Sequence, residues 1–364
     1  MLVHICCSVD SHFFLQKLRL LYPNKVLIGF FYNPNIHPPK EYQLRLLDVK
    51  RSSKKFGIKV IEGEYDYKRW LKATKGLENE PEKGDRCSVC FYCRLEVTAK
   101  KAIELGIKEI TTTLFTSPKK SITQLKVHAL NIETRYPLHV VTPNFRVNGG
   151  TQEQANMSKK NMLYHQNYCG CIFALERQRD SQNRLKDELM SPITLQVLPS
   201  SIQERVTLFK KIEKFERKKR KFTLKREKFL NYRLLRAFVR KGKEKIIPSY
   251  ILFYSSMKKE FIRGKIESIK NGIGYFNREE VLFIDLKKLN SLSNKNYNNI
   301  SDLMKKPLKI DEELQVREKL SYSKMISQNS IIVIDELEQD NYEILIKSKT
   351  YIDIREILIK NWVI

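Results

Sequence analysis

All seven cysteines of this 364-residue chain lie within its first 171 residues, in three short groups. The groups are Cys6 and Cys7 in HICCSVD, then Cys87, Cys90 and Cys93 in RCSVCFYC, then Cys169 and Cys171 in YCGC. Neighbouring thiolates repel one another and are costly to bury unless a cation neutralises them. Thiols grouped in this way, with Asp10 close to the first pair, predict a metal centre and outnumber the ligands of one structural zinc ion.

The spacing within each group indicates how it would meet a metal. Successive side chains of an extended segment point to opposite sides, so Cys6 and Cys7 are suited to reach two neighbouring centres. Cys87 and Cys90 fall at the start of an expected helix, where the helix dipole favours thiolates. Cys93 is expected to be a small buried hydrophobic residue rather than a ligand. An iron–sulfur cluster with a further metal fits this ligand count best.

The elements that must position these cysteines are strands separated by helices. Strands are expected in MLVHICC, KVLIGFFY, IKVIEGEY, EITTTLF and LHVVTP, with helical patterns between them. Such βαβ units imply an α/β domain over residues 1–176, a doubly wound parallel sheet with helices on both faces. Sheets of this kind build their sites in the loops at the strand ends, where we expect the cysteines to converge.

The rest of the chain has a different character. We expect a basic helical arm or linker over residues 177–245, and a small β-rich accessory domain over residues 246–364 with hairpin turns at Asn271–Gly272 and Gln339–Asn341. The net charge is +27, and residues 205–245 alone hold 18 Lys and Arg against 4 Asp and Glu. A basic run of this density predicts a polyanionic partner, although a solvated helix in a lysine-rich chain is the plainer explanation.

Two absences bear on the compartment. The N-terminal residues do not resemble a signal peptide, and no stretch has the length and apolar character of a membrane-spanning helix. We therefore expect a cytoplasmic protein without a membrane partner. Structural disulfides are uncommon in the cytosol, which leaves the thiols available to a metal.

Five motifs, in order along the chain, resemble the QueH-type epoxyqueuosine reductases. They are HICCSVD, GFFYNPNIHPPKEYQLR, DRCSVCFYCRLEVTA, EITTTLFTSPKK and QNYCGCIFA, and the resemblance covers residues 1 to about 176. It implies a PP-loop/HUP-like fold and reduction of the epoxide of epoxyqueuosine, at the tRNA wobble position, to give queuosine. It also implies a 4Fe-4S cluster, an additional iron ion, a tRNA partner and an electron donor protein or other reductant.

The resemblance also implies the ligands. The Cys-Cys-x-x-Asp, Cys-x-x-Cys and Cys-x-Cys patterns of the family fall on Cys6, Cys7, Asp10, Cys87, Cys90, Cys169 and Cys171. Asp10 and Cys7 are expected to serve catalysis, with Asp10 as an oxygen ligand of the second iron. Val9 stands where the family usually has proline, and Cys93 stands outside the pattern.

Further residues are expected to hold the substrate. Polar groups after the second and fourth strands are candidates for contact with the nucleoside or its cyclopentane diol, namely Asn33, Asn35, His37, Glu41, Arg45 and Thr112. Turn formation is an equal explanation for the first of these segments. The tRNA phosphates are expected to meet Lys218, Lys219, Arg220 and Lys221, in a run interleaved with aromatic residues at positions 209, 215, 222, 229, 232 and 238.

Two other interpretations remain open on the sequence. CCSVDS resembles the SGGxDS loop of PP-loop ATP pyrophosphatases, some of which are iron–sulfur enzymes that thiolate tRNA. That loop needs glycines so that backbone amides can approach a pyrophosphate, and cysteines stand in their place here, which disfavours ATP. The second alternative is a non-catalytic RNA-binding protein with a structural metal.

Overall fold

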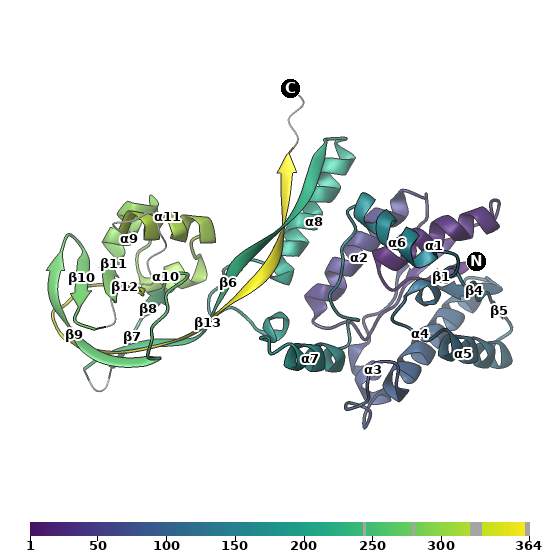
Figure 1. Ribbon diagram of the computed structural model, residues 1–364, viewed down its shortest axis with the longest axis horizontal. Helices are drawn as coiled ribbons and strands as arrows, with labels where there is room; N and C mark the ends of the chain where they lie inside the picture. The colour runs from purple at the N-terminus through teal and green to yellow at the C-terminus, as the bar shows by residue number, and fades with distance from the viewer. Residues whose placement is uncertain (243–244, 279–280, 321–329, 361–364) are drawn as a thin grey trace. The chain divides into compact units, whose positions relative to one another are not determined.

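A computed structural model of the chain describes residues 1–242, 245–278, 281–320 and 330–360 (Figure 1). The chain divides into two compact units. Unit 1 holds Met1–Leu189, Arg205–Leu224 and the described residues from 358 onward, and unit 2 holds Met190–Glu204 and Lys225–Ile357. Each unit has its own sheet and its own core.

Unit 1 is built on a five-stranded parallel sheet with the strand order β3-β2-β1-β4-β5. Its strands are β1 (Leu2–His4), β2 (Ile28–Phe31), β3 (Val60–Glu62), β4 (Glu109–Thr112) and β5 (His139–Val140). All five lie in the segments predicted from the sequence. Because the chain winds outward from β1 first through β2 and β3 and then through β4 and β5, the strand order reverses at β1, where ligands bind in sheets of this type.

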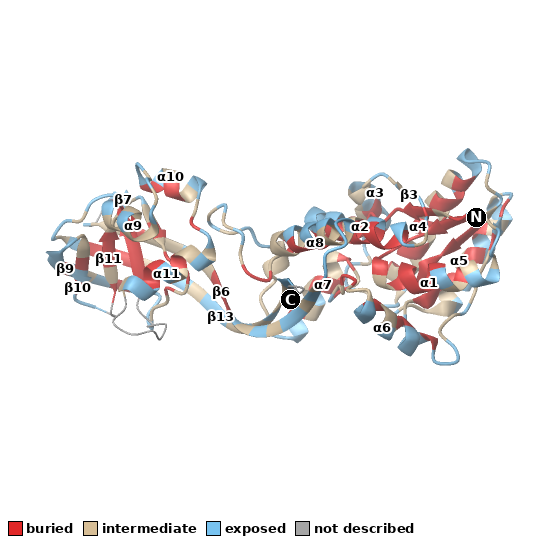
Figure 2. Ribbon diagram, turned by 90° about the horizontal axis from the view of Figure 1, so that it is seen from above, coloured by how far each residue is buried: buried red, intermediate tan, exposed pale blue. Residues whose placement is uncertain are grey.

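Helices cover both faces of this sheet (Figure 1). They are α1 (Ser8–Leu21), α2 (Pro39–Lys54), α3 (Tyr67–Ala73), α4 (Asp85–Glu104), α5 (Ile122–Arg135), α6 (Gly150–Lys160) and α7 (Ile172–Ser181), with 3-10 turns η1 (Thr113–Thr116) and η2 (Asp187–Leu189). Side chains alternate along β1, so Val3 packs against one core with α1 and α2, and Leu2 packs against another with α4 and α5. Figure 2 shows the buried residues gathered along these strands. The doubly wound fold is confirmed.

The basic segment is helical only in its first half. Helix α8 (Ile202–Arg217) packs against α2, where Glu216 pairs with Arg51 at 2.7 Å and Glu213 pairs with Lys54 at 2.6 Å. The second half is instead a 20-residue strand, β6 (Phe222–Lys241), so the prediction of a helical arm is wrong for these residues. Aromatic and branched residues recur along β6, and pairing with the equally long β13 (Asn341–Lys360) favours the strand.

Unit 2 contains most of an eight-stranded sheet with the order β7-β6-β13-β9-β10-β11-β12-β8. Its remaining strands are β7 (Lys245–Ile247), β8 (Ser249–Ile251), β9 (Phe261–Lys270), β10 (Ile273–Phe276), β11 (Leu282–Asp285) and β12 (Ile331–Ile334). Its helices are α9 (Leu286–Ser293), α10 (Ile300–Lys305) and α11 (Ile310–Leu320). Within the described residues, no helix is long and apolar enough to cross a membrane.

One predicted hairpin is confirmed and one is not. Asn271 and Gly272 have positive φ angles of 52° and 75° and connect the antiparallel strands β9 and β10, as a two-residue hairpin turn requires. The segment Gln339–Asn341 does not close a hairpin. It leads from β12, which pairs with β11 and β8, to β13, which pairs with β9.

Candidate metal centre and substrate cavity

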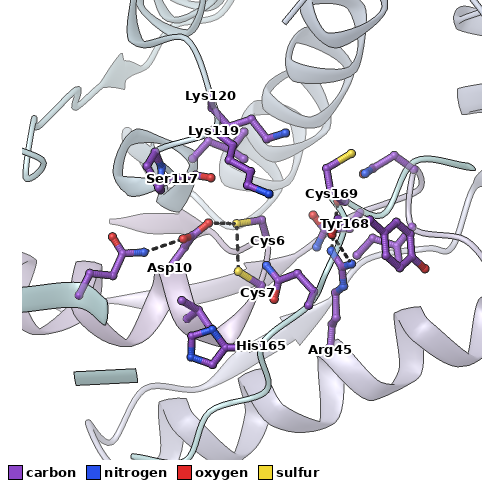
Figure 3. Close-up of a pocket in the computed structure, with 18 of the residues that line it drawn as sticks. Cys6, Cys7, Asp10, Arg45, Ser117, Lys119, Lys120, His165, Tyr168 and Cys169 are labelled. Atoms are coloured by element: carbon purple, nitrogen blue, oxygen red, sulfur yellow. Dashed lines mark hydrogen bonds between the residues drawn. The ribbon is translucent and has the colours of Figure 1, made fainter. Parts of the chain in front are cut away.

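A cavity of about 270 Å³ opens at the carboxyl ends of β1, β2 and β4 in unit 1 (Figure 3). Cys6, Cys7 and Asp10 border it from the β1–α1 segment, and Cys169 borders it from the loop before α7. Two of the three cysteine groups, which lie more than 160 residues apart in sequence, therefore meet at one cavity. This is the reversal point of the strand order, where the fold was expected to place its site.

The three donors of the CCxxD loop form a compact buried group. The ligand atoms of Cys6, Cys7 and Asp10 all lie within 4.8 Å of one another. The Cys6 thiol lies 3.8 Å from Cys7 Sγ and 3.2 Å from Asp10 Oδ2, and the dashed lines of Figure 3 follow these contacts. Two thiols and a carboxylate converging on one point are the donor set of a transition-metal ion.

Electrostatics agree with a cation at this point. The hydrogen bond to Cys6, burial and the nearby Asp10 carboxylate all raise the pKa of Cys7 well above its usual value. Burial likewise raises the pKa of Asp10, although hydrogen bonds from Cys6, Cys7 and Gln154 oppose it. Cys7 and Asp10 therefore ionise less readily than usual, and a metal ion would supply the positive charge that favours their ionised, ligating forms. The residues present therefore fit a metal.

Outer contacts hold these ligands in place. Thr113 Oγ1, in η1, accepts from the backbone N–H of Cys6 at 3.2 Å and lies 3.2 Å from its Sγ. Gln154 of α6 donates to Asp10 Oδ1 at 2.7 Å. The neighbouring Thr112 was predicted to contact substrate. Its Oγ1 is instead hydrogen-bonded to His4 Nδ1, at a distance of 2.8 Å.

The other four family-matched cysteines make up a second group, of which three pack together and Cys87 packs against the core that also holds Cys6 and Cys7. Cys90 and Cys171 are buried against Trp70 and Ala174, and Cys169 packs beside them. Burial raises the pKa of Cys87, and the charges of Cys169 and Cys90 add to this effect. Cys93 lies on the same helix as Cys90, is partly buried, and has its pKa raised by burial to about 11.

Positive charge and aromatic rings surround this second group. Although burial alone would lower it, the charges of Cys169 and Cys87 raise the pKa of Lys120, which also lines the cavity. Tyr67, Trp70 and Phe173 stack in sequence with ring centroids about 6 Å apart, at 5.9 and 6.0 Å. A cationic neighbour and an apolar cover are what a thiolate-ligated, negatively charged cluster requires.

A buried ion pair fixes the CxC loop. Arg45 and Glu41, both on α2, pair at 2.8 Å with only 3% and 1% of their side chains exposed. Arg45 also donates to the backbone carbonyls of Tyr168 and Cys169 at 3.0 and 3.1 Å. Tyr164 donates to Glu41 at 2.9 Å. Glu41 and Arg45 were both predicted to hold substrate. The contacts found for Glu41, and most of those found for Arg45, instead hold the loop that carries Cys169.

The remaining predicted substrate residues are divided. Asn33, Asn35 and Arg45 line the cavity, whereas His37, Glu41 and Thr112 are not among the described residues that do so. Asn33 is committed to the protein, because it donates to Ile5 O at 2.8 Å and accepts from Arg94 at 2.5 Å. His37 is fixed by its backbone, which bonds with Gly170 and Tyr168.

Several cavity residues were missed from the sequence. They come mostly from the loop after η1 and the segments around α6, and comprise Arg94, Ser117, Lys119, Lys120, Gln154, His165 and Gln166. Lys119 and Lys120 end the motif EITTTLFTSPKK, which was a usable signal. Gln154 lies in a stretch without any motif, so only the fold brings it to Asp10.

The predicted tRNA-binding residues form an exposed turn. Lys218, Lys219, Arg220 and Lys221 join α8 to β6 and are all exposed. The outward face of α8 adds the exposed Lys210, Lys211, Lys214 and Arg217, whereas its acids Glu213 and Glu216 pair with residues of α2. The exposed surface of this segment therefore has a larger excess of basic over acidic side chains than its composition alone indicates. Two of its aromatics, Phe209 and Tyr232, are core residues.

Comparison with known proteins identifies the family of this chain. A sequence profile described as "Epoxyqueuosine reductase QueH" matches residues 1–177. A protein of Helicobacter pylori with the same name is 40% identical over 360 residues, which are 96% of this chain and 97% of that protein. This chain belongs to the QueH family of epoxyqueuosine reductases. The resemblance seen in the motifs is confirmed, and the QueH chain is an oxidoreductase.

Shorter QueH relatives match about half of the chain. The Acinetobacter baylyi protein is 39% identical over 193 residues, 52% of this chain and 88% of its own length. The Thermotoga maritima protein is 35% identical over 182 residues, 49% of this chain and 92% of its own length. Since the family profile ends at residue 177, the residues after it are an extension of this QueH chain that the Helicobacter pylori relative shares.

One solved structure aligns with more than half of this chain. The U34-tRNA thiolase NcsA from Methanococcus maripaludis with its 4Fe-4S cluster aligns with 59% of this chain and 73% of its own, at 16% identity and a TM-score of 0.33. A likeness this slight carries no argument about function. Two alternatives were kept from the sequence, an ATP-dependent thiolation enzyme and a non-catalytic RNA-binding protein. Membership of the QueH family speaks against both.

Proposed function

We propose that this chain reduces the epoxide of epoxyqueuosine in tRNA, within the cavity bordered by Cys6, Cys7, Asp10 and Cys169. The observation that carries the proposal is the convergence of two thiols and a carboxylate within 4.8 Å at the wall of that cavity, in a chain of the QueH family. Converting an epoxide to an alkene breaks two carbon–oxygen bonds, takes two electrons and two protons, and releases water.

The donor sets divide the work between two metal sites. Cys87, Cys90, Cys169 and Cys171 would hold the 4Fe-4S cluster, and Asp10 with the Cys6–Cys7 pair would hold the additional iron. When bound, a 4Fe-4S cluster supplies electrons singly, and an iron with an open position supplies Lewis acidity toward the epoxide oxygen. Cys6 and Cys7 were expected to reach two different centres, but they lie beyond the end of β1 with their sulfurs 3.8 Å apart, which favours both as ligands of the additional iron. An electron donor protein or a small reductant must restore the electrons.

The chain's own residues prepare this chemistry. Thr113 fixes Cys6 through two contacts, and Gln154 fixes the carboxylate of Asp10, so neither ligand has to be ordered when a metal binds. The Glu41–Arg45 pair fixes the carbonyls of the CxC loop. The stack of Tyr67, Trp70 and Phe173 keeps water from the second cysteine group.

The tRNA itself would be held by the basic end of α8. Lys218, Lys219, Arg220 and Lys221 are exposed together, and the two acids nearest to them on α8, Glu213 and Glu216, are engaged by Lys54 and Arg51. Lysine and arginine bind phosphates without reading sequence, which suits an anticodon stem-loop whose identity is read at the modified base. Single-stranded loop bases also stack on aromatics, for which the partly exposed Phe215 and Phe222 of this segment remain available.

The decisive experiment is a turnover assay. Protein purified without oxygen is given tRNA that carries epoxyqueuosine and a chemical reductant, and the nucleosides are then analysed by mass spectrometry. We expect epoxyqueuosine to be replaced by queuosine, and the protein to be brown. A colourless protein that contains zinc, or an iron-loaded protein that leaves the epoxide intact, would overturn the proposal.

A further inference from the structure

Helix α3 covers part of the second cysteine group. On its inner side, Trp70 packs with Cys90 and Cys171 and is only 1% exposed. Tyr67 and Leu71 of the same helix pack against this group as well. An α-helix with its side chains is about 10–12 Å across. A molecule bound to the outer side of α3 would therefore lie roughly one helix diameter from the proposed 4Fe-4S ligands.

The outer side of α3 is basic. Lys68, Arg69 and Lys72 are exposed on the helix, and Lys75 is exposed directly after it. Lys68 and Lys72 are neighbours on the helix surface, because residues four apart lie one above the other. None of the three lysines forms an ion pair with the described residues. We call these four residues the basic side of α3.

Acidic residues compensate this charge only in part. Arg69 is paired with Asp66 at 3.8 Å and with Glu96 at 3.3 Å. Glu78 lies near Lys75. The further acids that follow in the sequence belong to the loop before α4 and not to α3. The two lysines on the helix itself therefore present positive charge that no described acid neutralises by pairing.

The basic side of α3 is separate from the substrate cavity. No residue of α3 is among the described residues that line the cavity. Helix α6, which contributes Gln154 to the cavity, lies on the opposite side of unit 1 from α3 in both views (Figures 1 and 2). A partner can therefore occupy α3 while a nucleotide of the tRNA occupies the cavity.

A small acidic protein that carries electrons fits this surface. Complementary charge speeds the encounter of two proteins, and electron-transfer complexes bury little area, so a surface as small as α3 suffices. The lysines would also attract a tRNA, but a tRNA gains nothing from lying against the second cysteine group. Electron transfer does gain, because it slows steeply as the distance between the two redox centres grows.

We propose that the basic side of α3 is the docking surface for an acidic protein that carries single electrons on an iron–sulfur cluster or a flavin. In each encounter one electron leaves this carrier, which is oxidised, and enters the 4Fe-4S cluster, which is reduced, and no atom is transferred. Two encounters supply the two electrons that one epoxide consumes, and solvent supplies the two protons. The assignment rests on the proposed function and names the partner that serves its second cysteine group.

The test uses the anaerobic, iron-loaded full chain and an acidic, plant-type 2Fe-2S ferredoxin as the probe. The wild type is compared with a variant that combines Lys68→Glu, Lys72→Glu and Lys75→Glu. Calorimetry with oxidised ferredoxin should show binding that is about tenfold or more weaker in the variant at low salt. Stopped-flow absorbance should show that reduced ferredoxin reduces the cluster of the variant more slowly by a similar factor. Added salt should weaken wild-type binding, because it screens exposed charges.

A matched variant and a second reductant separate docking from folding and from total charge. Glutamates at the exposed Lys59, Lys108 and Lys126 make the same change of charge elsewhere on unit 1 and should leave ferredoxin binding nearly unchanged. Photoreduced 5-deazariboflavin, which is small and uncharged, should reduce the wild type and both variants at the same rate. Iron content should be equal in all three proteins.

Three outcomes would overturn the proposal. The first is a wild type that binds no ferredoxin, and the second is an α3 variant that binds and accepts electrons from ferredoxin as the wild type does. The third is an α3 variant that loses affinity for tRNA but not for ferredoxin, which would assign the basic side of α3 to tRNA. In each case turnover of epoxyqueuosine with the chemical reductant still decides the proposed function by itself. An iron-loaded wild type that leaves the epoxide intact would overturn both.

Discussion

Unit 1 and unit 2 both bury a glutamate and an arginine four residues apart on one helix. In unit 1 these are Glu41 and Arg45 of α2, and in unit 2 they are Glu313 and Arg317 of α11. A tyrosine donates to each glutamate, Tyr164 at 2.9 Å and Tyr250 at 2.6 Å. The arginine also donates to the backbone of a distant loop, Arg45 to two carbonyls and Arg317 to the carbonyl of Tyr254. Each glutamate–arginine pair thus holds a loop in place. We call Glu41–Arg45 the clamp of unit 1 and Glu313–Arg317 the clamp of unit 2.

The electrostatic balance of the two clamps differs. In unit 1, burial is outweighed by Glu41 and neighbouring tyrosines, and the pKa of Arg45 is raised. In unit 2, burial prevails, raising the pKa of Glu313 to about 7 and lowering the pKa of Arg317 to about 10. Arg45, which holds the CxC loop of unit 1, therefore stays charged across neutral pH, whereas the Glu313–Arg317 pair of unit 2 is sensitive to pH.

The largest effect should come from removing Asp10. We expect wild-type protein to hold about five irons and about four sulfides per chain, and Asp10→Ala to lose the additional iron while keeping most of the cluster absorbance. Activity should fall about 100-fold or more, since loss even of a ligand's supporting contacts costs up to that much. Iron analysis, absorbance and the turnover assay measure these quantities.

The comparison between the units supplies the control. Asp302→Ala removes an acid from the first turn of α10 in unit 2, and it should leave iron content and turnover unchanged. If Asp10→Ala keeps full iron and full activity, Asp10 is not a ligand, and the division of labour between the units loses its basis.

A weaker tRNA complex should follow from reversing the charge of the α8–β6 turn. Lys218, Lys219, Arg220 and Lys221 changed to glutamate should weaken tRNA binding roughly 100-fold or more at low salt. The slope of log K against log salt should also flatten, because each lost phosphate contact removes up to about one released counterion. Affinity measured over a salt series tests both, and iron content should stay constant.

An equal charge change elsewhere on unit 1 is the control. Glutamates at the exposed and scattered positions Lys59, Lys75, Lys108 and Lys126 should weaken binding only slightly. Identical losses in the two variants would show that total charge, and not this turn, attracts the tRNA. Unaltered affinity in the turn variant would assign the tRNA to other surfaces.

Breaking the clamp of unit 1 should have the largest effect on stability. Arg45→Met leaves the buried Glu41 without its partner and frees two carbonyls of the CxC loop, at a cost of about 3–5 kcal/mol. Lys50→Met, which breaks an exposed pair with Glu62, should cost less than about 1 kcal/mol. Urea unfolding of both variants gives these free energies, and similar losses would show that the buried pair is no clamp.

The sequence predicted the parts of unit 1 that depend on local pattern. The five strands follow from short apolar runs between helices, and the reversal of strand order then places Cys6 and Cys169 together. The proposed ligand set came from motif spacing and its resemblance to a family, and it stays a prediction. These features need only the order of residues along the chain.

What the sequence did not predict depends on partners distant in the chain. Glu41 looks like a substrate contact until Tyr164 and the CxC loop are beside it, and Gln154 has no signal until α6 lies over Asp10. Strand β6 was expected to be helical because its charges and aromatics also recur at helical spacing. Its pairing with β13, more than 100 residues later, decides the matter.

The smallest expected effect concerns pH and the clamp of unit 2. Burial raises the pKa of Glu313 from its ordinary 4.5 to about 7, against hydrogen bonds from Tyr250, the Phe253 N–H and Gln196 and the charge of Arg317. Between these two values the folded unit keeps a proton that the unfolded chain has released. The associated stability is therefore complete below about pH 4.5 and is lost as the pH rises through about 7. The full loss is on the order of 3 kcal/mol.

This dependence can be measured locally by hydrogen exchange. Peptides that contain Phe253 and α11 should lose protection between pH 5.5 and pH 8, after correction for the intrinsic exchange rate. In Glu313→Gln the loss should disappear, because glutamine keeps acceptors for Tyr250 and the Phe253 N–H but has no proton to release. Peptides of the CxC loop in unit 1 should show no such change, since Arg45 stays charged throughout. An equal loss in both units, or an undiminished loss in Glu313→Gln, would mean that the two clamps do not differ in the way their burial and pairing indicate.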